Sequence, residues 1–345
     1  MLSGRPASGR DPARRALVAG AGGFIGHHLT AFLKRQGFWV RGVDLKHPEY
    51  APTEADEFLI LDLRERESCN RASESIDEIY QLAADMGGMG YISENHAHIF
   101  TNNSLININM LATARESRVR RFLCASSACV YPEHLQYEAA VTPLKEEYAY
   151  PANPQDAYGW EKLTSERLCM YYRQDYGLET RIARFHNIFG PLGTWEGGRE
   201  KAPAALCRKI AVAKITGNPE VEIWGDGEQT RSFCYIDDCL SGIYGLMQSD
   251  YPEPLNLGQD RMVSINELAD IIAEVAGVSI VKVHVPGPQG VRGRNSDNSR
   301  VGDILGWEPE VSLEEGLALT YRWVEEKVRA SIHSTEEATV VAIGR

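Results

Sequence analysis

The 345-residue chain lacks three features that mark large classes of protein. No apolar run approaches the roughly 18 residues that a membrane-spanning helix needs. Basic residues are in the minority, with 36 Lys and Arg against 48 Asp and Glu, so the basic face of a nucleic-acid binder is not expected. The seven cysteines include no CxxC pair and no disulfide-like spacing, which favours free thiols in a reducing cytoplasm.

Strands and helices alternate through the first half of the chain. Apolar runs of four to six residues, each closed by Gly or Asp, are separated by segments with helical periodicity. This α/β pattern predicts a doubly wound parallel sheet. The expected strands are Ala16–Ala19, Trp39–Val43, Glu57–Leu61, Glu78–Leu82, Arg121–Ala125 and Thr180–Phe185, and the expected helices are Phe24–Gln36, Asn102–Ser117 and Ala157–Tyr176.

The composition changes beyond Asn187. Loops rich in Gly and Pro alternate there with short helices such as Ile265–Ala276, which indicates a smaller, loop-rich substrate lobe. We therefore expect a nucleotide-binding domain over residues 16–186 and a mainly substrate-binding lobe over 187–330. Residues 1–15 are Arg-rich and faintly like a transit peptide, but a disordered extension is the preferred interpretation. Residues 331–345 are expected to form a loosely held tail.

A glycine-rich loop, GAGGFIG, follows the first strand and opens the first helix. Glycines in this context let backbone N–H groups approach a pyrophosphate at a helix N-terminus, which predicts a dinucleotide. Asp44 ends the next strand and would accept hydrogen bonds from an adenosine ribose, which favours NAD over NADP. Asp62 could contact the adenine edge or cap the helix after it. The loop's candidate cofactor contacts are Gly20, Gly23, Phe24, Ile25 and Gly26.

Tyr158 and Lys162 lie four residues apart on a predicted helix, so both side chains project from one face. An adjacent ammonium favours the phenolate, which would make Tyr158 a base for a sugar hydroxyl. YxxxK alone is a weak pattern and could be a surface pair. Ser126 and Ser127 end the strand before it, and Cys129 follows two residues later, although simple alcohol oxidation needs no thiol.

The order of glycine loop, Ser-Ser and YxxxK resembles the extended short-chain dehydrogenase/reductase family, over nearly the whole chain. Four segments narrow the resemblance: AADMGGMG, SSACVYP, RFHNIFGPLGTWEGGREKAPAA and PGPQGVRGRNSDN are similar to the members that epimerise GDP-mannose at C3 and C5. The resemblance implies NAD as cofactor, a GDP-sugar substrate and a homodimer. It also implies conversion of GDP-D-mannose to GDP-L-galactose and GDP-L-gulose, on the route to ascorbate.

The resemblance assigns a role to the extra thiol. Tyr158, beside Lys162, would take the proton of the C4 hydroxyl while hydride leaves C4, and Ser127 would bind the same oxygen. The resulting ketone acidifies the C–H bonds at C3 and C5, so that an acid and a base on opposite ring faces can invert both centres. By the resemblance Cys129 is the base and Lys201 the acid, and hydride return regenerates NAD.

An acidic chain that binds a diphosphate must gather cations locally, and the C-terminal loops carry Arg199, Arg208 and Arg292 among others. Arg292 and Arg294 compete for the diphosphate, and the sequence does not separate them. No metal site is expected. By the resemblance, the residues that contact the nucleotide sugar are Gly87, Ser126, Ser127, Cys129, Asn187, Glu200, Lys201, Ala202, Lys209, Gln229, Thr230, Arg231 and Arg294.

Two alternatives stay open. A nucleotide-hexose 4-epimerase needs only the Ser, Tyr and Lys set, and it gives no reason for both Cys129 and Lys201. A non-catalytic NAD-binding regulator could lose Tyr158 or Lys162 without consequence, so their joint presence counts against it. A sugar 4,6-dehydratase is disfavoured because Ala128-Cys129 supplies no carboxylate where the members of that group carry an Asp-Glu pair.

Overall fold

The computed structural model describes residues 13–288 and 290–343. At its centre is a seven-stranded sheet, in the order β11-β6-β5-β4-β1-β2-β3, in which every neighbouring pair is parallel. The predicted doubly wound parallel sheet is confirmed. Its strands are β1 (Arg15–Ala19), β2 (Trp39–Asp44), β3 (Glu57–Ile60), β4 (Glu78–Gln81), β5 (Arg121–Ser127), β6 (Glu179–Phe185) and β11 (Leu255–Leu257).

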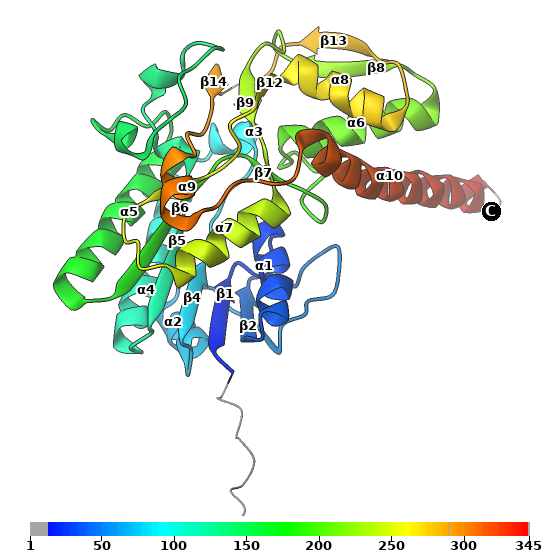
Figure 1. Cartoon of the computed structure of the whole chain (residues 1–345). Coiled ribbons are helices and arrows are strands. Elements are labelled where there is room, and N and C mark those ends of the chain that lie inside the picture. The colour runs from blue at the N-terminus through cyan, green and yellow to red at the C-terminus, as the bar shows by residue number, and fades with distance from the viewer. Residues whose placement is uncertain (1–12, 289, 344–345) are drawn as a thin grey trace, which may run out of the picture.

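Helices cover both faces of this sheet (Figure 1). On one face α1 (Phe24–Arg35) packs against α7 (Ile236–Gln248), and on the other α4 (His96–Glu116) packs between α2 (Arg66–Ser73) and α5 (Ala157–Tyr176). β1 is apolar at successive positions because its side chains alternate between two cores. Ala16 and Val18 face the core that includes α1, whereas Leu17 and Ala19 face the core of α2, α4 and α5.

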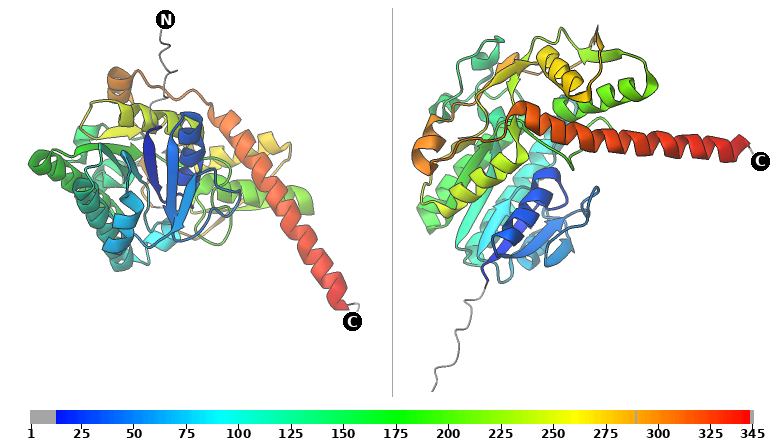
Figure 2. Two further views of the ribbon diagram at one scale, coloured as in Figure 1. Left: turned by 90° about the horizontal axis from the view of Figure 1, so that it is seen from below. Right: turned by 45° about the vertical axis from the view of Figure 1, so that its right-hand side comes forward.

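The smaller lobe stands over the carboxyl ends of the strands (Figures 1 and 2). Two elements beyond residue 187, α7 and β11, pack on or join the central sheet and do not belong to the lobe. The lobe is therefore not one continuous stretch of the chain. Its elements are β7 (Ile188–Phe189), α6 (Ala202–Thr216), β8 (Glu220–Trp224), β9 (Thr230–Ser232), β10 (Cys234–Tyr235), β12 (Met262–Ser264), α8 (Ile265–Ala276), β13 (Val281–Val285), β14 (Gly293–Arg294), α9 (Ser299–Leu305) and α10 (Leu313–Ile343).

Short elements fill the connections beside the lobe. They are α3 (Met89–Ile92) and the 3₁₀ helices η1 (Ala128–Val130), η2 (Glu133–Gln136) and η3 (Glu146–Ala149). The long helix α10 projects from the body (Figure 2). It continues to Ile343, through most of the stretch expected as a tail. Residues 344–345 of that tail, and residues 1–12 of the expected N-terminal extension, lie outside the described residues.

One helix differs from its sequence prediction. The expected helix Asn102–Ser117 begins six residues earlier, because α4 starts at His96. The first turn, with its two histidines, lacks the apolar periodicity that marks a helix in sequence. The prediction failed there because tertiary contacts fix this turn. Ile99 is fully buried and packs in a cluster with Ile92 and Tyr158.

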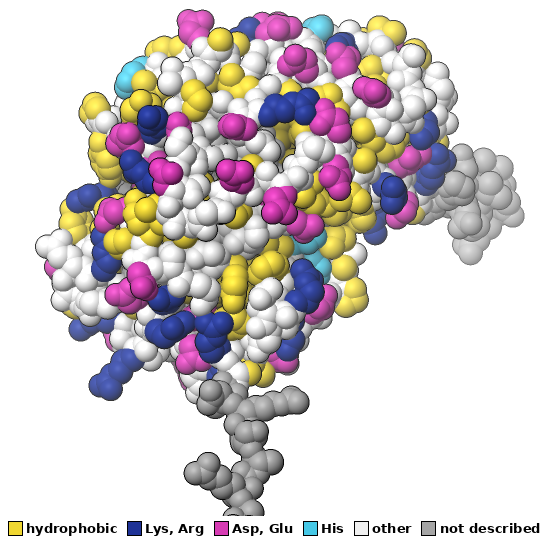
Figure 3. Space-filling view, viewed as in Figure 1, with side chains coloured by type: hydrophobic (Ala, Val, Ile, Leu, Met, Phe, Trp, Pro, Cys, Tyr) yellow, Lys and Arg dark blue, Asp and Glu magenta, His cyan; other side chains and the backbone are white. Residues whose placement is uncertain are grey.

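The surface is mixed in charge. Figure 3 shows Asp and Glu side chains spread over one face with Lys and Arg between them, in keeping with the net charge of -12. Within residues 13–288 and 290–343, no helix is both long and apolar enough to cross a bilayer.

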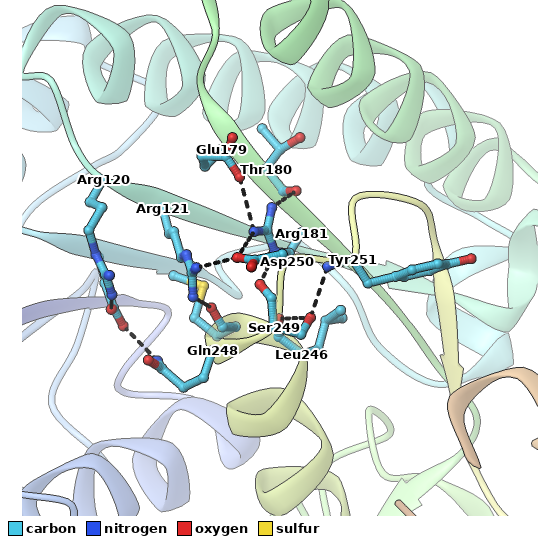
Figure 4. Close-up of polar contacts among 12 residues, drawn as sticks. Arg120, Arg121, Glu179, Thr180, Arg181, Leu246, Gln248, Ser249, Asp250 and Tyr251 are labelled. Atoms are coloured by element: carbon cyan, nitrogen blue, oxygen red, sulfur yellow. Dashed lines mark hydrogen bonds and ion pairs between the residues drawn. The ribbon is translucent and has the colours of Figure 1, made fainter. Parts of the chain in front are cut away.

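Three arginines, Arg120, Arg121 and Arg181, lie near the amino ends of β5 and β6 (Figure 4). Arg181 on β6 is fully buried; its guanidinium donates to Glu179 at 3.0 Å and to the Ser249 carbonyl at 2.9 Å. Arg121 on β5 donates to Asp250 at 2.9 Å, and Arg120 pairs with the buried Glu78. Each of these arginines therefore has a carboxylate partner.

Candidate active site

The glycine loop has the shape that a dinucleotide requires. Gly20 has φ +85°, which favours glycine, and a Cβ on Gly22 would lie 2.3 Å from the Lys46 carbonyl oxygen. A Cβ on Gly26 would lie 2.1 Å from the Gly20 carbonyl oxygen, so helix α1 can start here only with glycine. The glycines thus keep side chains away from the N-terminus of α1, where a pyrophosphate fits.

Asp44 stands at the end of β2 beside this loop. Its carboxylate accepts hydrogen bonds from Gly22 N at 2.9 Å and Leu45 N at 2.7 Å. Both bonds fix the carboxylate at the sheet edge where a ribose would lie. Asp62 accepts from the backbone N of Arg64 at 2.9 Å and pairs with its guanidinium at 2.6 Å. Asp62 therefore orders the turn that follows β3, and its contact with adenine stays a prediction.

Tyr158 and Lys162 occupy the first turns of α5, whose N-cap Asp156 accepts from Gly159 N at 2.8 Å. Both side chains are buried, and the Lys162 ammonium lies 5.5 Å from the centre of the Tyr158 ring. Burial raises the pKa of Tyr158, and Lys162 is the main influence in the opposite direction. A phenolate at Tyr158 therefore depends on nearby positive charge, of which Lys162 is the main source.

Cys129 is fixed directly against this tyrosine. Ser127 is the N-cap of η1 and accepts from Cys129 N at 3.2 Å. A Cβ on Gly159 would lie 2.2 Å from the Cys129 carbonyl oxygen, so only glycine lets η1 and α5 meet so closely. Cys129 also packs with Met86 and Tyr158 in one small apolar cluster. The thiol and the phenol thus belong to one rigid corner of the fold.

The second serine faces other partners. Ser126 is buried and donates to Glu166 on α5, which in turn holds Arg184 on β6 at 2.7 Å. Successive residues of a strand point to opposite faces, which separates Ser126 from Ser127. The Ser126 hydroxyl is held by the buried ion pair of Glu166 and Arg184, and its contact with the substrate stays a prediction.

Lys201 comes from the smaller lobe and is the N-cap of α6. The residue is accessible to solvent, yet the protein around its ammonium lowers its pKa by desolvation, with Cys129 the next influence, acting upward. The positive end of the α6 dipole acts in the same direction as desolvation. A Cβ on Gly88 would lie 2.9 Å from the Glu200 carbonyl oxygen, so the loop before α3 supports the backbone next to Lys201.

The structure separates the two arginines that the sequence could not. Arg292 is on the surface, where it forms a two-pronged ion pair with Asp226 at 2.7 and 2.9 Å. Arg294 is 8% exposed and donates to the Cys129 sulfur at 3.3 Å. Its Nε donates to the side-chain oxygen of Gln136 at 2.6 Å. Arg294 therefore belongs to the site, and Arg292 lies outside it.

Arg231 adjoins Arg294 across the β9–β14 pair. Its guanidinium donates to the carbonyls of Thr230 at 2.7 Å and Val291 at 2.6 Å. Burial, and next the charge of Arg294, lower the pKa of Arg231 to about 9. Two guanidinium groups held this close favour an anion between them, as a diphosphate would provide.

Most of the other predicted substrate residues form side-chain hydrogen bonds within the protein. Glu200 accepts from Arg208 at 2.9 Å and from Gly198 N at 2.7 Å, and Lys209 donates to the Glu222 carbonyl at 2.8 Å. Such side chains stabilise the lobe, and their contact with a ligand stays a prediction. Asn187, Gln229 and Thr230 likewise donate to backbone carbonyls, those of Ser232, Trp224 and Ala139 respectively. Of the remaining two predicted residues, Ala202 is the first residue of α6, and a Cβ on Gly87 would lie 3.0 Å from Tyr91.

Sequence reasoning missed the residues that hold Arg294 and α5 in place. Gln136 is fully buried and donates to the carbonyls of Tyr131 and Pro132, both at 3.2 Å. Its oxygen then faces Arg294, which is 158 residues away in sequence. No local signal marks such a residue. Only its position four residues after Pro132, within the SSACVYP segment and its continuation, could have drawn attention to it.

Known proteins resemble this chain over most of its length. Residues 16–258 match the model of the NAD dependent epimerase/dehydratase family. The GDP-mannose 3,5-epimerase of Arabidopsis thaliana is 50% identical over 313 residues, which are 90% of this chain and 82% of that protein. GDP-mannose 3,5-epimerase 1 of Oryza sativa subsp. indica is 50% identical over 316 residues, 91% of this chain and 82% of its own length.

Solved structures agree with the fold. The UDP-glucose 4-epimerase of Thermotoga maritima, solved with UDP-glucose, has a TM-score of 0.82 at 26% identity and covers 91% of this chain and 99% of its own. The UDP-glucuronic acid 4-epimerase of Bacillus cereus, solved with UDP-glucuronic acid and NAD, has a TM-score of 0.76 at 25% identity, over 90% of this chain and 99% of its own. With the glycine loop, Asp44 and the Tyr158–Lys162 pair in place, the chain belongs to the NAD dependent epimerase/dehydratase family.

Proposed function

We propose that this protein is a GDP-mannose 3,5-epimerase that forms GDP-L-galactose and GDP-L-gulose from GDP-D-mannose. The observation that carries the proposal is the junction of Cys129 with Tyr158 and Lys201. A thiol lies against the oxidising tyrosine, and an amine from the opposite lobe lies within electrostatic reach of that thiol. The 50% identity to the Arabidopsis thaliana and Oryza sativa enzymes supports the same conclusion.

Tyr158 begins the reaction as a base. As phenolate it accepts the proton of the sugar C4 hydroxyl, while Lys162 holds its charge and Ser127 hydrogen-bonds the oxygen. When bound, NAD takes the hydride from C4 and later gives it back, so that it is not consumed. Gly22, Gly26 and Asp44 are the residues that would hold it. The product of this half of the reaction is the 4-keto sugar.

Cys129 and Lys201 carry the middle of the reaction. The 4-keto group acidifies the neighbouring C–H bonds, and the thiolate of Cys129 removes a proton from C5 or C3. Lys201 returns a proton to the opposite face of the ring, which inverts the centre. Arg294 donates to the Cys129 sulfur at 3.3 Å and so holds the thiol in position. The lowered pKa of Lys201 makes its ammonium a readier proton donor.

Isotope exchange tests this proposal. The protein is incubated with GDP-mannose in D2O, and the recovered sugars are analysed by NMR. We expect deuterium at C5 and, to a smaller extent, at C3, with L-galactose and L-gulose configured products. Loss of exchange in Lys201→Met, with NAD still bound, would support the acid assignment. Wild-type protein that binds NAD and GDP-mannose yet exchanges at neither carbon would overturn the proposal.

A nucleotide-hexose 4-epimerase is the second candidate, because the Thermotoga maritima enzyme shares the fold at a TM-score of 0.82. Such an enzyme inverts C4 without breaking a C–H bond at C3 or C5. The same NMR spectra therefore distinguish the two: inversion at C4 without deuterium incorporation would favour the 4-epimerase.

A homodimer is part of the proposal. α4 and α5 lie side by side and present large apolar side chains to solvent, which a second copy of the pair would cover. Analytical ultracentrifugation tests this, with Ile108→Glu on α4 expected to yield monomers. The exposed residues are Phe100, Leu105, Ile108, Trp160, Tyr171 and Tyr176.

The cytoplasm is the compartment that the cysteines support. All seven are free thiols, and six of them are buried. Proteins in oxidising compartments use cysteines mainly as disulfides, so seven unpaired thiols favour a reducing environment. There the GDP-L-galactose would be available for ascorbate formation.

A further inference from the structure

Glu161 is a buried carboxylate that no step above uses. We propose that Glu161 is a positioning residue that keeps Lys162 protonated and neutralises the charge that NAD brings to the site. The inference rests on the proposed function only for the roles of Tyr158 and Lys162. It concerns cofactor binding and is independent of the identity of the sugar.

Three elements hold this carboxylate in place. Glu161 is fully buried, and its Oε1 accepts from Asn107 Nδ2 on α4 at 2.8 Å and from Ser165 Oγ on α5 at 2.7 Å. Asn107 Nδ2 also donates to Ser165 Oγ at 3.0 Å, and its Oδ1 accepts from Gln81 on β4 at 3.0 Å. The set fixes one oxygen of Glu161 and leaves the other facing Lys162.

The second oxygen of Glu161 faces the ammonium of Lys162. Oε2 has no hydrogen-bond partner within the described part of the chain and lies 3.9 Å from the Lys162 ammonium. A carboxylate at this distance is the counter-charge of Lys162, whereas a proton on Oε2 would lack an acceptor.

The influences on Lys162 agree with this. Burial is the largest and lowers its pKa, but Glu161 and then Tyr158 act upward, and the net pKa is raised. The other groups that face Lys162 are the thiols of Cys124 and Cys169. A hydrogen bond with Cys124 and then burial raise the pKa of Cys169, which stays a neutral thiol. Glu161 is thus the main source of the charge that keeps this lysine protonated.

The charges then balance in both halves of the reaction. With NAD bound, the nicotinamide carries +1, Lys162 +1, Glu161 −1 and a Tyr158 phenolate −1, which sum to zero. After the sugar has given up its proton and hydride, Tyr158 and the reduced ring are both neutral, and Lys162 with Glu161 again sum to zero. Without Glu161 both states carry an uncompensated positive charge in a buried site, where it is costly.

The test compares the binding of NAD with that of NADH. Calorimetry on protein freed of copurified cofactor gives the dissociation constant of each, and their ratio isolates the charge on the nicotinamide. Glu161→Gln should weaken NAD relative to NADH on the order of tenfold, because it removes one full negative charge from a buried, low-dielectric site. A purely structural role would change both constants by the same factor.

Two control variants sharpen the result. Glu161→Asp keeps the charge and should keep the wild-type ratio even if both constants weaken. Glu146→Gln neutralises another buried glutamate, one that burial already shifts to a higher pKa and that is not among the groups acting on Lys162 or Tyr158. It should also leave the ratio unchanged.

A milder variant keeps the proposal testable if Glu161→Gln does not fold. Ser165→Ala removes one of the two donors to Oε1 and loosens the carboxylate from its position beside Lys162. It should weaken NAD relative to NADH in the same direction as Glu161→Gln, by a smaller factor. Asp156 and Cys129 also face Tyr158 and are unchanged in this variant. An unaltered ratio in Glu161→Gln, or, if that variant is unfolded, an unaltered ratio in Ser165→Ala, overturns the inference.

Discussion

Both edges of the central sheet carry positively charged side chains, but the partners of these side chains differ between the two edges. At the amino edge Arg120, Arg121 and Arg181 each meet a carboxylate (Figure 4). At the carboxyl edge Arg294 meets an amide oxygen and a thiol, and Lys201 forms no salt bridge within the described ranges. Cations matched by acids stabilise the fold, whereas those without acids are available to an anionic ligand and to proton transfer.

The largest expected effect tests the carboxyl edge. Cys129→Ala should reduce deuterium exchange at C5 by at least about a hundredfold, because it removes the proposed base of both inversions. NAD binding, measured by calorimetry, should stay at the wild-type level, since the thiol lies on η1 and not in the glycine loop. Exchange at the wild-type rate in Cys129→Ala would remove the thiol from the mechanism.

At the amino edge we expect a substitution to change the stability of the fold and not the activity. Arg181→Ala leaves the Thr180 and Ser249 carbonyls without their donor and opens a cavity, which should cost about 2–4 kcal/mol of unfolding free energy. Thermal unfolding measures this, and the folded fraction should turn over substrate normally. A variant that lost activity without losing stability would contradict the comparison between the edges.

We expect acid to destabilise the fold through the buried side chain of His186. His186 donates from Nε2 to Asn256 Oδ1, and burial lowers its pKa to about 3. The unfolded chain takes up this proton near pH 6.5, so the stability that neutral His186 contributes is present above that pH. It is lost as the pH falls from about 6.5 towards 3, by up to about 1.4 kcal/mol per unit. Denaturant titrations from pH 7 to 4 should show this slope, and His186→Gln should reduce it.

The smallest effect separates two neighbouring arginines. Arg292→Gln removes a surface ion pair with the exposed Asp226, so the melting temperature and the turnover should both stay at wild-type values. Arg294→Gln should lower turnover on the order of tenfold and weaken inhibition by GDP, since its guanidinium reaches both the thiol and the neighbouring Arg231. Equal effects of the two substitutions would refute their separation into site and surface.

Local pattern predicted the framework well and the site only in part. Helix α5 begins and ends where the sequence predicts, at Ala157 and Tyr176, because Asp156 caps it and Gly177 closes it in the left-handed conformation. The resemblance places both Ser126 and Ser127 at the substrate, whereas the Ser126 hydroxyl donates to the buried Glu166. The two serines point to opposite faces because they are successive residues of β5.

Contacts between distant segments account for most of what the sequence could not predict. Arg294 on β14 and Cys129 on η1 are 165 residues apart in sequence, and the fold brings them to 3.3 Å. The same holds for Glu161, whose carboxylate is held by Asn107 on another helix. Neither relation leaves a periodic or compositional trace, since each depends on the packing of separate elements.

The close approach of Gly159 to the Cys129 carbonyl has an evolutionary consequence. Gly159 follows Tyr158 on α5 and meets the backbone that carries the Cys129 thiol, and no side chain lies in this contact. A larger residue at 159 would push η1 away from α5, so selection for either of the two proposed reactions would keep glycine here. We expect a saturation library at this position to return glycine alone among clones that make an epimerised product.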